Sequence, residues 1–265
     1  MTVQSSVLQL PDGRDLGYCL AGAEKGTPFF TFHGLPGSRM ESHLLDAAAK
    51  KRNIKIITPD RPGYGLSTRY PKRTLLGWSD DVSCLADALH LDTFGVIGIS
   101  GGAPCALSCA YTIPDRITST GIVCGLGPLY QTGLGSDMRW FVTGGFFLAH
   151  SFPWLLKIIH GLPALMLAKT MREKLMLNIR EAFRQGTAGA VQDMQLYARD
   201  WGFSLQDIKS RIDIWHGDAD DIVPISHGQY LHHHLPNSTF TTMPGQAHFS
   251  LPIACAESIL ARLSE

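Results

Sequence analysis

A serine between small residues is the first feature of the chain that could do chemistry. Ser100 stands in Gly98-Ile99-Ser100-Gly101-Gly102, directly after a short apolar run. A serine on a sharp turn from a strand to a helix needs small residues two positions before and after it, and Gly98 and Gly102 supply them. The helix N-terminus behind the turn favours developing negative charge. This context predicts a nucleophile, and the alternative interpretation is a glycine-rich turn with an exposed serine.

A serine hydroxyl is a weak nucleophile until a base takes its proton, and histidine suits that task near neutral pH. His248 follows an apolar run and Gly245, so we expect it on a loop at the end of a strand. A carboxylate must then orient the imidazole and stabilise its cation. Asp218, Asp220 and Asp221 compete for that role.

The elements that position these residues are predicted from apolar runs bounded by turn residues. Strands are expected at 7–10, 16–21, 28–32, 54–58, 94–99, 117–124, 212–215 and 238–243, the first two joined as a hairpin. Apolar spacings of three and four predict helices over 75–89, 103–111, 226–235 and 252–263. Alternation of strands and helices indicates an α/β fold with a mainly parallel sheet, covered on both faces. In such sheets the chemistry collects at the carboxyl ends of the strands.

One long segment breaks this alternation. Residues 128–210 contain no convincing strand, and an excursion of that length is usually functional. We interpret it as a helical cap, so the predicted core comprises 1–127 and 211–265. The alternative is an irregular part of the core.

Over nearly its whole length the chain resembles the α/β-hydrolase superfamily. The motifs that carry the resemblance are His33-Gly34-Leu35-Pro36-Gly37-Ser38, Asp60-Arg61-Pro62-Gly63-Tyr64-Gly65-Leu66-Ser67, Gly98-Ile99-Ser100-Gly101-Gly102, Gly217-Asp218-Ala219-Asp220-Asp221-Ile222-Val223-Pro224 and Gly245-Gln246-Ala247-His248. Nucleophile, acid and histidine follow in the order that this fold uses. The resemblance implies a mostly parallel, eight-stranded sheet flanked by helices, with a helical cap after the sixth strand.

The resemblance also implies roles for single residues. Spacing to Val223-Pro224 selects Asp220 as the acid, with Asp218 as the alternative. The oxyanion donors would be the backbone N–H groups of Leu35 and Gly101. We expect a cis peptide before Pro36, a loop-organising role for His33, and loop-pinning roles for Arg39 and Arg61.

A serine at this turn argues against relatives that attack with aspartate, such as epoxide hydrolases. The predicted function is hydrolysis of a carboxylic ester, or of a lactone or thioester, through an acyl-enzyme. Alternatives are a ligand receptor or signalling protein with slow turnover, an acyltransferase, and a carbon–carbon bond hydrolase. The predicted substrate is small to medium, uncharged and lipophilic, and it would lie against Phe146, Phe147, Trp154 and Phe249. Water is the second reactant, and no cofactor and no metal are expected.

The amino-acid composition limits the partners and the compartment that we expect for this chain. The chain has 265 residues, of which 45% are hydrophobic and 17% charged, and its formal net charge is +0. This balance gives no electrostatic footprint for nucleic acid. We expect no signal peptide, no membrane span in the apolar run 141–168, and a cytoplasmic location with six free cysteines. The consecutive His232, His233 and His234 point in different directions around a helix, which disfavours a metal site.

Overall fold

The computed structural model describes residues 4–131, 134, 138 and 169–265, and of residues 169–172 only the backbone. Eight strands form one sheet in the order β1-β2-β4-β3-β5-β6-β7-β8. Strand β2 is antiparallel to β1 and β4, and every other neighbouring pair is parallel. The strands are β1 (Gln4–Gln9), β2 (Asp15–Gly22), β3 (Thr27–Phe32), β4 (Ile54–Pro59), β5 (Phe94–Ile99), β6 (Ile117–Val123), β7 (Ile212–Gly217) and β8 (Ser238–Met243). The predicted hairpin and mostly parallel sheet are therefore confirmed.

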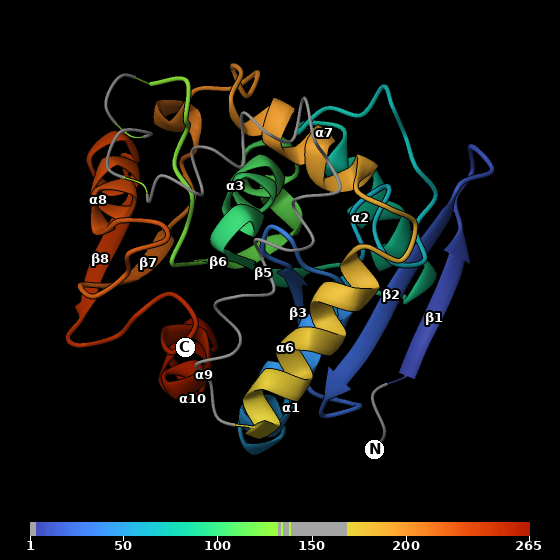
Figure 1. The fold of residues 1–265 in the computed structure, drawn as a ribbon, viewed down its shortest axis with the longest axis horizontal. Helices are drawn as coiled ribbons and strands as arrows, with labels where there is room; N and C mark the ends of the chain where they lie inside the picture. The colour runs from blue at the N-terminus through green and yellow to red at the C-terminus, as the bar shows by residue number, and fades with distance from the viewer. Residues whose placement is uncertain (1–3, 132–133, 135–137, 139–168) are drawn as a thin grey trace.

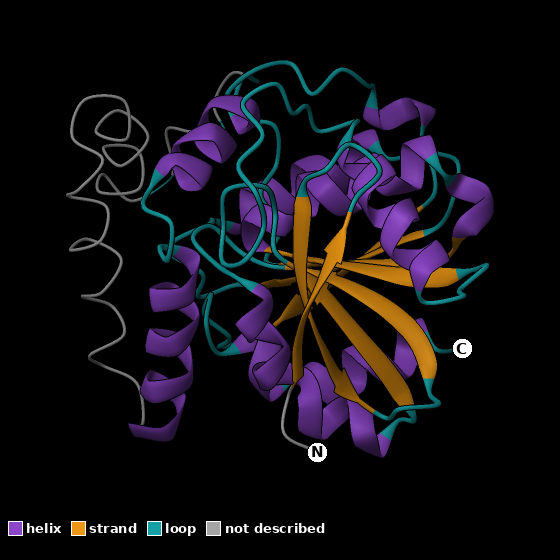
Figure 2. Cartoon of the chain, turned by 90° about the vertical axis from the view of Figure 1, so that its right-hand side faces the viewer, coloured by secondary structure: helices purple, strands orange, loops and turns teal. Residues whose placement is uncertain are grey.

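Helices cover both faces of this sheet, as Figures 1 and 2 show. They are α1 (Ser42–Lys51), α2 (Trp78–Ala88), α3 (Ala103–Thr112), α6 (Lys169–Ala182), α7 (Ala188–Tyr197), α8 (Ile225–His234), α9 (Leu251–Ala254) and α10 (Ala256–Leu263). Short 3-10 turns include η1 (Arg39–Glu41) and η2 (Ser100–Gly102). The predicted helices 75–89, 103–111 and 226–235 are confirmed within a few residues.

Two details of the helix prediction are wrong. The single helix expected over 252–263 is two helices, because Cys255 leaves helical geometry at φ −103° and ψ 4° while the apolar spacing continues across it. Helix α1 is absent from the predicted set. Only three of its ten residues are buried, Ser42, Leu45 and Ala49, so its apolar stripe is short.

Two apolar cores lie on the two faces of the sheet. One joins α2, α3 and α8 to the sheet through residues such as Trp78, Leu107 and Leu231. The other joins α1, α9 and α10 to it through residues such as Leu45 and Ile259. All residues of β5 and β7 are buried, as expected for central strands covered on both faces. These rigid strands carry the loops that hold the site.

Between β6 and β7 the described residues contain helices and turns but no strand. Helix α6 runs alongside the turn η1, and Asn178 of α6 receives hydrogen bonds from Ser38 N and Ser38 Oγ, both at 2.8 Å. Tyr197 of α7 is fully buried in the core above α2 and α3. The predicted domain boundaries at 128 and 210 stay a prediction, and so does the cap. Among the described residues no helix is long and apolar enough to cross a membrane, and the run 141–168 lies outside them.

Candidate active site

Ser100 lies at the sharp turn from β5 into η2 and α3. Its φ is +55°, in the left-handed region that a residue other than glycine rarely adopts. A Cβ atom on Gly98 would come 2.7 Å from Ala103 Cα, and one on Gly102 would collide with Phe32 O. The small residues two positions before and after Ser100 are therefore required by close packing of the turn against α3 and β3. Strain of this kind at an observed outlier points to a functional position.

The three side chains predicted for the triad lie in one hydrogen-bonded row. His248 Nε2 is 2.9 Å from Ser100 Oγ, and His248 Nδ1 is 2.7 Å from Asp220 Oδ2. All three residues are buried, with 7–8% of their surface exposed. They come from the loops after β5, β7 and β8, which meet at the carboxyl edge of the sheet. This arrangement lets the imidazole take a proton from the serine while the carboxylate faces the imidazolium that forms.

Of the three competing aspartates, only Asp220 is bonded to the histidine. Its Oδ1 accepts hydrogen bonds from Ile222 N at 3.0 Å and Val223 N at 2.9 Å. Burial raises the pKa of Asp220, but His248 and these hydrogen bonds outweigh burial, and the net shift is downward. Asp218 is exposed and accepts from Gly245 N at 2.7 Å, and Asp221 is exposed. The geometry thus favours the acid that the spacing selected.

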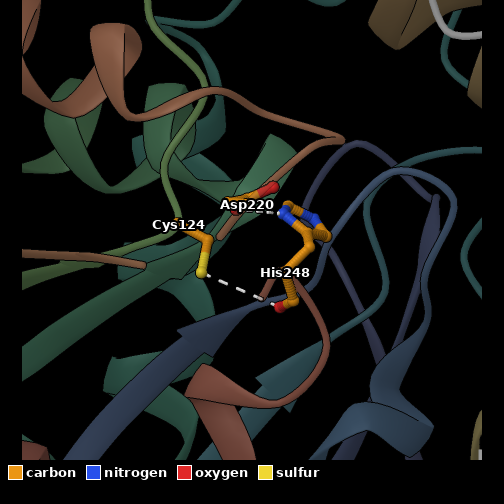
Figure 3. A group of neighbouring side chains, drawn as sticks. All are labelled: Cys124, Asp220 and His248. Carbon is orange, nitrogen blue, oxygen red and sulfur yellow. Dashed lines mark hydrogen bonds and ion pairs between the residues drawn. The ribbon is translucent and has the colours of Figure 1, made fainter. Parts of the chain in front are cut away.

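Two further side chains, His216 at the end of β7 and Cys124, lie near the pair of Asp220 and His248. His216 Nε2 is 2.8 Å from Val223 O and 3.6 Å from Asp220 Oδ2, and burial lowers the pKa of His216. The Cys124 thiol lies 3.7 Å from the His248 carbonyl oxygen, as Figure 3 shows. Cys124 also has a positive φ, +49°, at the end of β6.

Cys124, Asp220 and His248 form the one group of metal-ligating side chains found in the described part of the chain, with ligand atoms within 4.8 Å of one another. Burial raises the pKa of Cys124 well above its ordinary value, so the thiol is protonated at neutral pH and is a poor ligand. The 2.7 Å bond between Asp220 and His248 would also have to break. The group therefore favours a proton relay over a cation.

The two predicted oxyanion donors lie side by side. A Cβ atom on Gly101 would come 2.7 Å from Leu35 Cβ and 3.2 Å from Leu35 N. The peptide between Leu35 and Pro36 is cis, as expected. Leu35 N therefore lies close to Gly101, the residue that follows Ser100. Their use as an oxyanion hole remains a prediction.

The peptide that carries Leu35 N–H is held at its other end by two side chains. Arg61 Nη2 donates to Gly34 O at 2.8 Å. Arg61 N donates to His33 Nε2, so His33 Nδ1 carries the proton and donates to the same oxygen at 2.9 Å. Because Gly34 C=O and Leu35 N–H belong to one peptide plane, these bonds fix the direction of the N–H. The loop-organising roles predicted for His33 and Arg61 are confirmed.

Buried charges connect this loop to the segment between β6 and β7. Arg61 Nε lies 2.9 Å from Asp193 Oδ2 on α7, and Arg73 Nη2 lies 2.5 Å from Asp193 Oδ1. Burial raises the pKa of Asp193, but the two guanidinium groups and Tyr64 outweigh it and lower the pKa to about 2. Arg39 pairs with Asp60 and with Glu181 of α6. The loop-pinning role predicted for Arg39 is thus confirmed, and its reach to α6 is new.

Glu41 is a further buried carboxyl beside the oxyanion loop, and the sequence analysis did not identify it. Glu41 Oε2 accepts a hydrogen bond from Gly34 N at 2.8 Å. Glu41, Asp193 and Asn178 stand in stretches without a motif or a strand end, so no pattern marks them as part of the site.

An apolar cluster lies beside the oxyanion loop. Phe249, the one described member of the predicted pocket, places its ring edge-on to His248 at 5.4 Å between centroids. Phe249 and Leu35 pack against buried residues of α6, α7 and their surroundings, Tyr64, Leu175, Ile179, Ala182, Phe183, Ala190 and Met194. Phe146, Phe147 and Trp154 lie outside the described residues. The consecutive histidines of α8 are remote from this cluster, with His232 on Ser238 and His234 stacked on Tyr230.

Comparison with known proteins agrees with this geometry. The sequence model of the alpha/beta hydrolase fold family matches residues 27–253. The chain belongs to this family.

Individual relatives are distant. The chain is 25% identical over 258 residues to the uncharacterized hydrolase YcgS of Bacillus subtilis (strain 168), covering 89% of each protein. It is 28% identical over 226 residues to the dihydrolipoyllysine-residue acetyltransferase component of an acetoin cleaving system of Pseudomonas putida, covering 82% of this chain and 58% of that protein. Among solved structures, an esterase from Exiguobacterium antarcticum superposes with a TM-score of 0.80 at 17% identity, covering 99% and 100% of the two chains. A hydrolase from Pseudomonas aeruginosa PA01 gives 0.77 at 20%, covering 99% of each. At such identities the structures show the shared alpha/beta hydrolase fold.

Proposed function

We propose that this protein is a serine hydrolase that cleaves a carboxylic ester through an acyl-enzyme. Membership of the alpha/beta hydrolase family and the relative YcgS support a hydrolase. The observation that carries the proposal is the row of hydrogen bonds from Asp220 through His248 to Ser100, at 2.7 and 2.9 Å. Ser100 would be the nucleophile, His248 the base and Asp220 the residue that orients it.

The reaction would run in two balanced halves. His248 takes the hydroxyl proton as Ser100 Oγ attacks the ester carbonyl carbon, and the oxyanion accepts hydrogen bonds from Leu35 N and Gly101 N. The intermediate collapses, its ester C–O bond breaks, and His248 gives the proton to the leaving alcohol. Water then attacks the acyl-enzyme by the same steps and releases the acid. These steps use water as the only second reactant.

The apolar side chains near the proposed triad favour an uncharged, lipophilic acyl group of small to medium size. Phe249 packs against His248, Leu35 lies beside Gly101, and both pack against the apolar cluster of α6 and α7. Apolar walls with a few fixed polar groups are typical of sites for small molecules. An ester, a lactone and a thioester would meet the same oxyanion donors, so all three belong to the proposed class.

Acyl transfer is the second candidate, because one relative is named as an acetyltransferase component. An acyl-enzyme on Ser100 can pass its acyl group to an alcohol or a thiol instead of water. Adding an alcohol acceptor to the assay separates the two functions: a hydrolase releases mainly the acid, whereas a transferase forms mainly the new ester.

The test is covalent labelling followed by turnover. We expect a fluorophosphonate to label wild-type protein on Ser100, located by mass spectrometry, and p-nitrophenyl butyrate to be hydrolysed. The matched control is S258A, an exposed serine on α10 remote from the site, which should label and turn over as wild type does. Labelling of a different residue, or none, would overturn the proposal.

A further inference from the structure

Glu41 is a buried carboxyl that the mechanism above does not use. Only 8% of its surface is exposed, and its Oε2 holds Gly34 N at 2.8 Å. A Cβ atom on Gly34 would lie 3.5 Å from Ser100 Cβ and 3.9 Å from Glu41 Oε1. The nucleophile and this carboxyl therefore border the same face of Gly34, the residue before the proposed donor Leu35.

Both the backbone N–H and the backbone C=O of Gly34 are hydrogen-bonded to side chains. Glu41 binds its N–H, while Arg61 and His33 bind its C=O. A buried N–H without a partner costs about as much as a lost hydrogen bond, so the Gly34 N–H needs an acceptor at this position. An amide oxygen or the carbonyl oxygen of a neutral carboxyl can also accept this hydrogen bond. A negative charge is therefore not required for positioning the loop.

A negative charge here would oppose the proposed reaction. The transition state places negative charge on the substrate oxygen beside Leu35 N and Gly101 N. A negative charge on Glu41, which binds the neighbouring Gly34 N–H, would repel that oxygen. The neutral acid keeps the hydrogen bond to Gly34 without that repulsion.

The surroundings of Glu41 leave its charge weakly compensated. Elements α1, α6, β2 and β4 pack around the turn that carries Glu41. Their titratable groups include His43, Asp46, Lys174, Glu181 and Cys19, and the charged groups that act on Glu41 are Arg61 and His248. Arg39 is paired with Asp60 and Glu181, and Arg61 with Asp193. Burial raises the pKa of Glu41 to about 7, although Gly34 N, Arg61 and His248 act in the opposite direction. Burial also holds the pKa of His33 well below its ordinary value, so His33 does not titrate near neutrality.

We propose that Glu41 is a positioning residue that supports the oxyanion loop in its neutral form, so that loss of its proton slows hydrolysis. This inference rests on the proposed hydrolase function. The rate should therefore fall on the alkaline side as Glu41 ionises. The expected fall is roughly tenfold, the size of a modest charge repulsion in the transition state.

The decisive variant is E41Q, whose amide oxygen can still accept from Gly34 N. We expect kcat for p-nitrophenyl butyrate in E41Q to match the wild-type maximum and to lack the alkaline fall. In E41L, which leaves the Gly34 N–H without an acceptor, kcat should drop about tenfold at every pH, again without the alkaline fall. The control E257Q removes a surface carboxylate of α10 that pairs with Lys51 and Arg52, and it should keep the wild-type profile.

A second measurement does not depend on turnover. The pKa of Glu41 in the folded chain, about 7, lies above its ordinary value of 4.5. Between these values the unfolded chain releases the proton and the folded chain keeps it, so wild-type stability should fall relative to E41Q as pH rises from about 5 to 7 and then level off. Urea denaturation of both proteins at several pH values measures this difference.

The outcomes are distinguishable. A wild type that neither labels nor turns over overturns the proposed function, and this use of Glu41 with it. A labelled, active wild type whose alkaline fall persists in E41Q overturns the Glu41 proposal alone. An unchanged stability difference between pH 5 and 8 overturns it as well.

Discussion

Two kinds of groups surround Ser100, side chains of two loops and main-chain groups of two others. On one side stand the side chains of His248 and Asp220, carried by loops after β8 and β7 and joined to the serine by bonds of 2.9 and 2.7 Å. The other groups are main-chain groups of Leu35 and Gly101, and the side chains of Glu41 and Arg61 bind the neighbouring Gly34.

The two sets of groups are also anchored by different parts of the fold. His248 and Asp220 are held by the loops that follow β8 and β7 at one end of the sheet. The oxyanion side depends on Arg61, Asp193 and Asn178, which tie its loop to α6 and α7 between β6 and β7. A change in α6 or α7 should therefore reach the oxyanion side first, and the pair of His248 and Asp220 much less. The predictions below test that contrast.

The largest effect is expected at the nucleophile. S100A should lower kcat by about ten-thousandfold or more and abolish fluorophosphonate labelling, because a residual rate comes only from binding and oxyanion stabilisation. Circular dichroism and thermal unfolding check that the fold is kept. A variant that retains more than about a hundredth of wild-type turnover, measured on freshly purified protein, would rule out Ser100 as nucleophile.

The next effect concerns the acid. D220N should lower kcat by about ten-thousandfold, since an asparagine favours the wrong imidazole tautomer. D218N is the matched control, because Asp218 is exposed and its carboxylate accepts a hydrogen bond from Gly245 N. We expect D218N to stay within about tenfold of wild type. Equal losses in the two variants would remove the distinction on which the triad assignment depends.

The anchor on α7 should matter mainly for stability. D193N leaves the buried guanidinium groups of Arg61 and Arg73 without their carboxylate, which costs about 3–5 kcal/mol in the free energy of unfolding. The folded pKa of Asp193, about 2, lies below its ordinary value. This contribution is therefore present above about pH 4 and is lost as pH falls toward 2.

Urea denaturation of wild type and D193N between pH 3 and 8 measures it. D87N is the control, because Asp87 pairs with Arg116 at the surface and should change stability little. A D193N protein as stable as D87N at pH 7 would show that α7 is not anchored through this cluster.

The residues that could be predicted from the sequence differ in the same way from those that could not. The proposed triad of Ser100, Asp220 and His248 lies at strand ends, and glycine neighbours leave a pattern that marks these residues. All eight strands were predicted from short apolar runs bounded by turns. Glu41 and Asp193 left no such mark, since a buried charge is recognisable only when its partner is known, and those partners lie 7 and 132 residues away in Gly34 and Arg61. Helix α1 and the break at Cys255 depend on local packing that periodicity does not resolve.

The smallest effect tests the apolar wall beside the oxyanion loop. Each methylene added to an uncharged p-nitrophenyl acyl ester should stabilise the transition state by up to about 0.8 kcal/mol, or roughly fourfold in kcat/KM, until the pocket is full. If Phe249 forms part of this wall, F249A should flatten that rise while leaving the pH profile unchanged, because the ring touches His248 but donates no hydrogen bond. An acyl chain ending in a carboxylate should be hydrolysed more slowly than its methyl ester, since the wall offers it no compensating charge. A preference for the charged chain would contradict the lipophilic pocket.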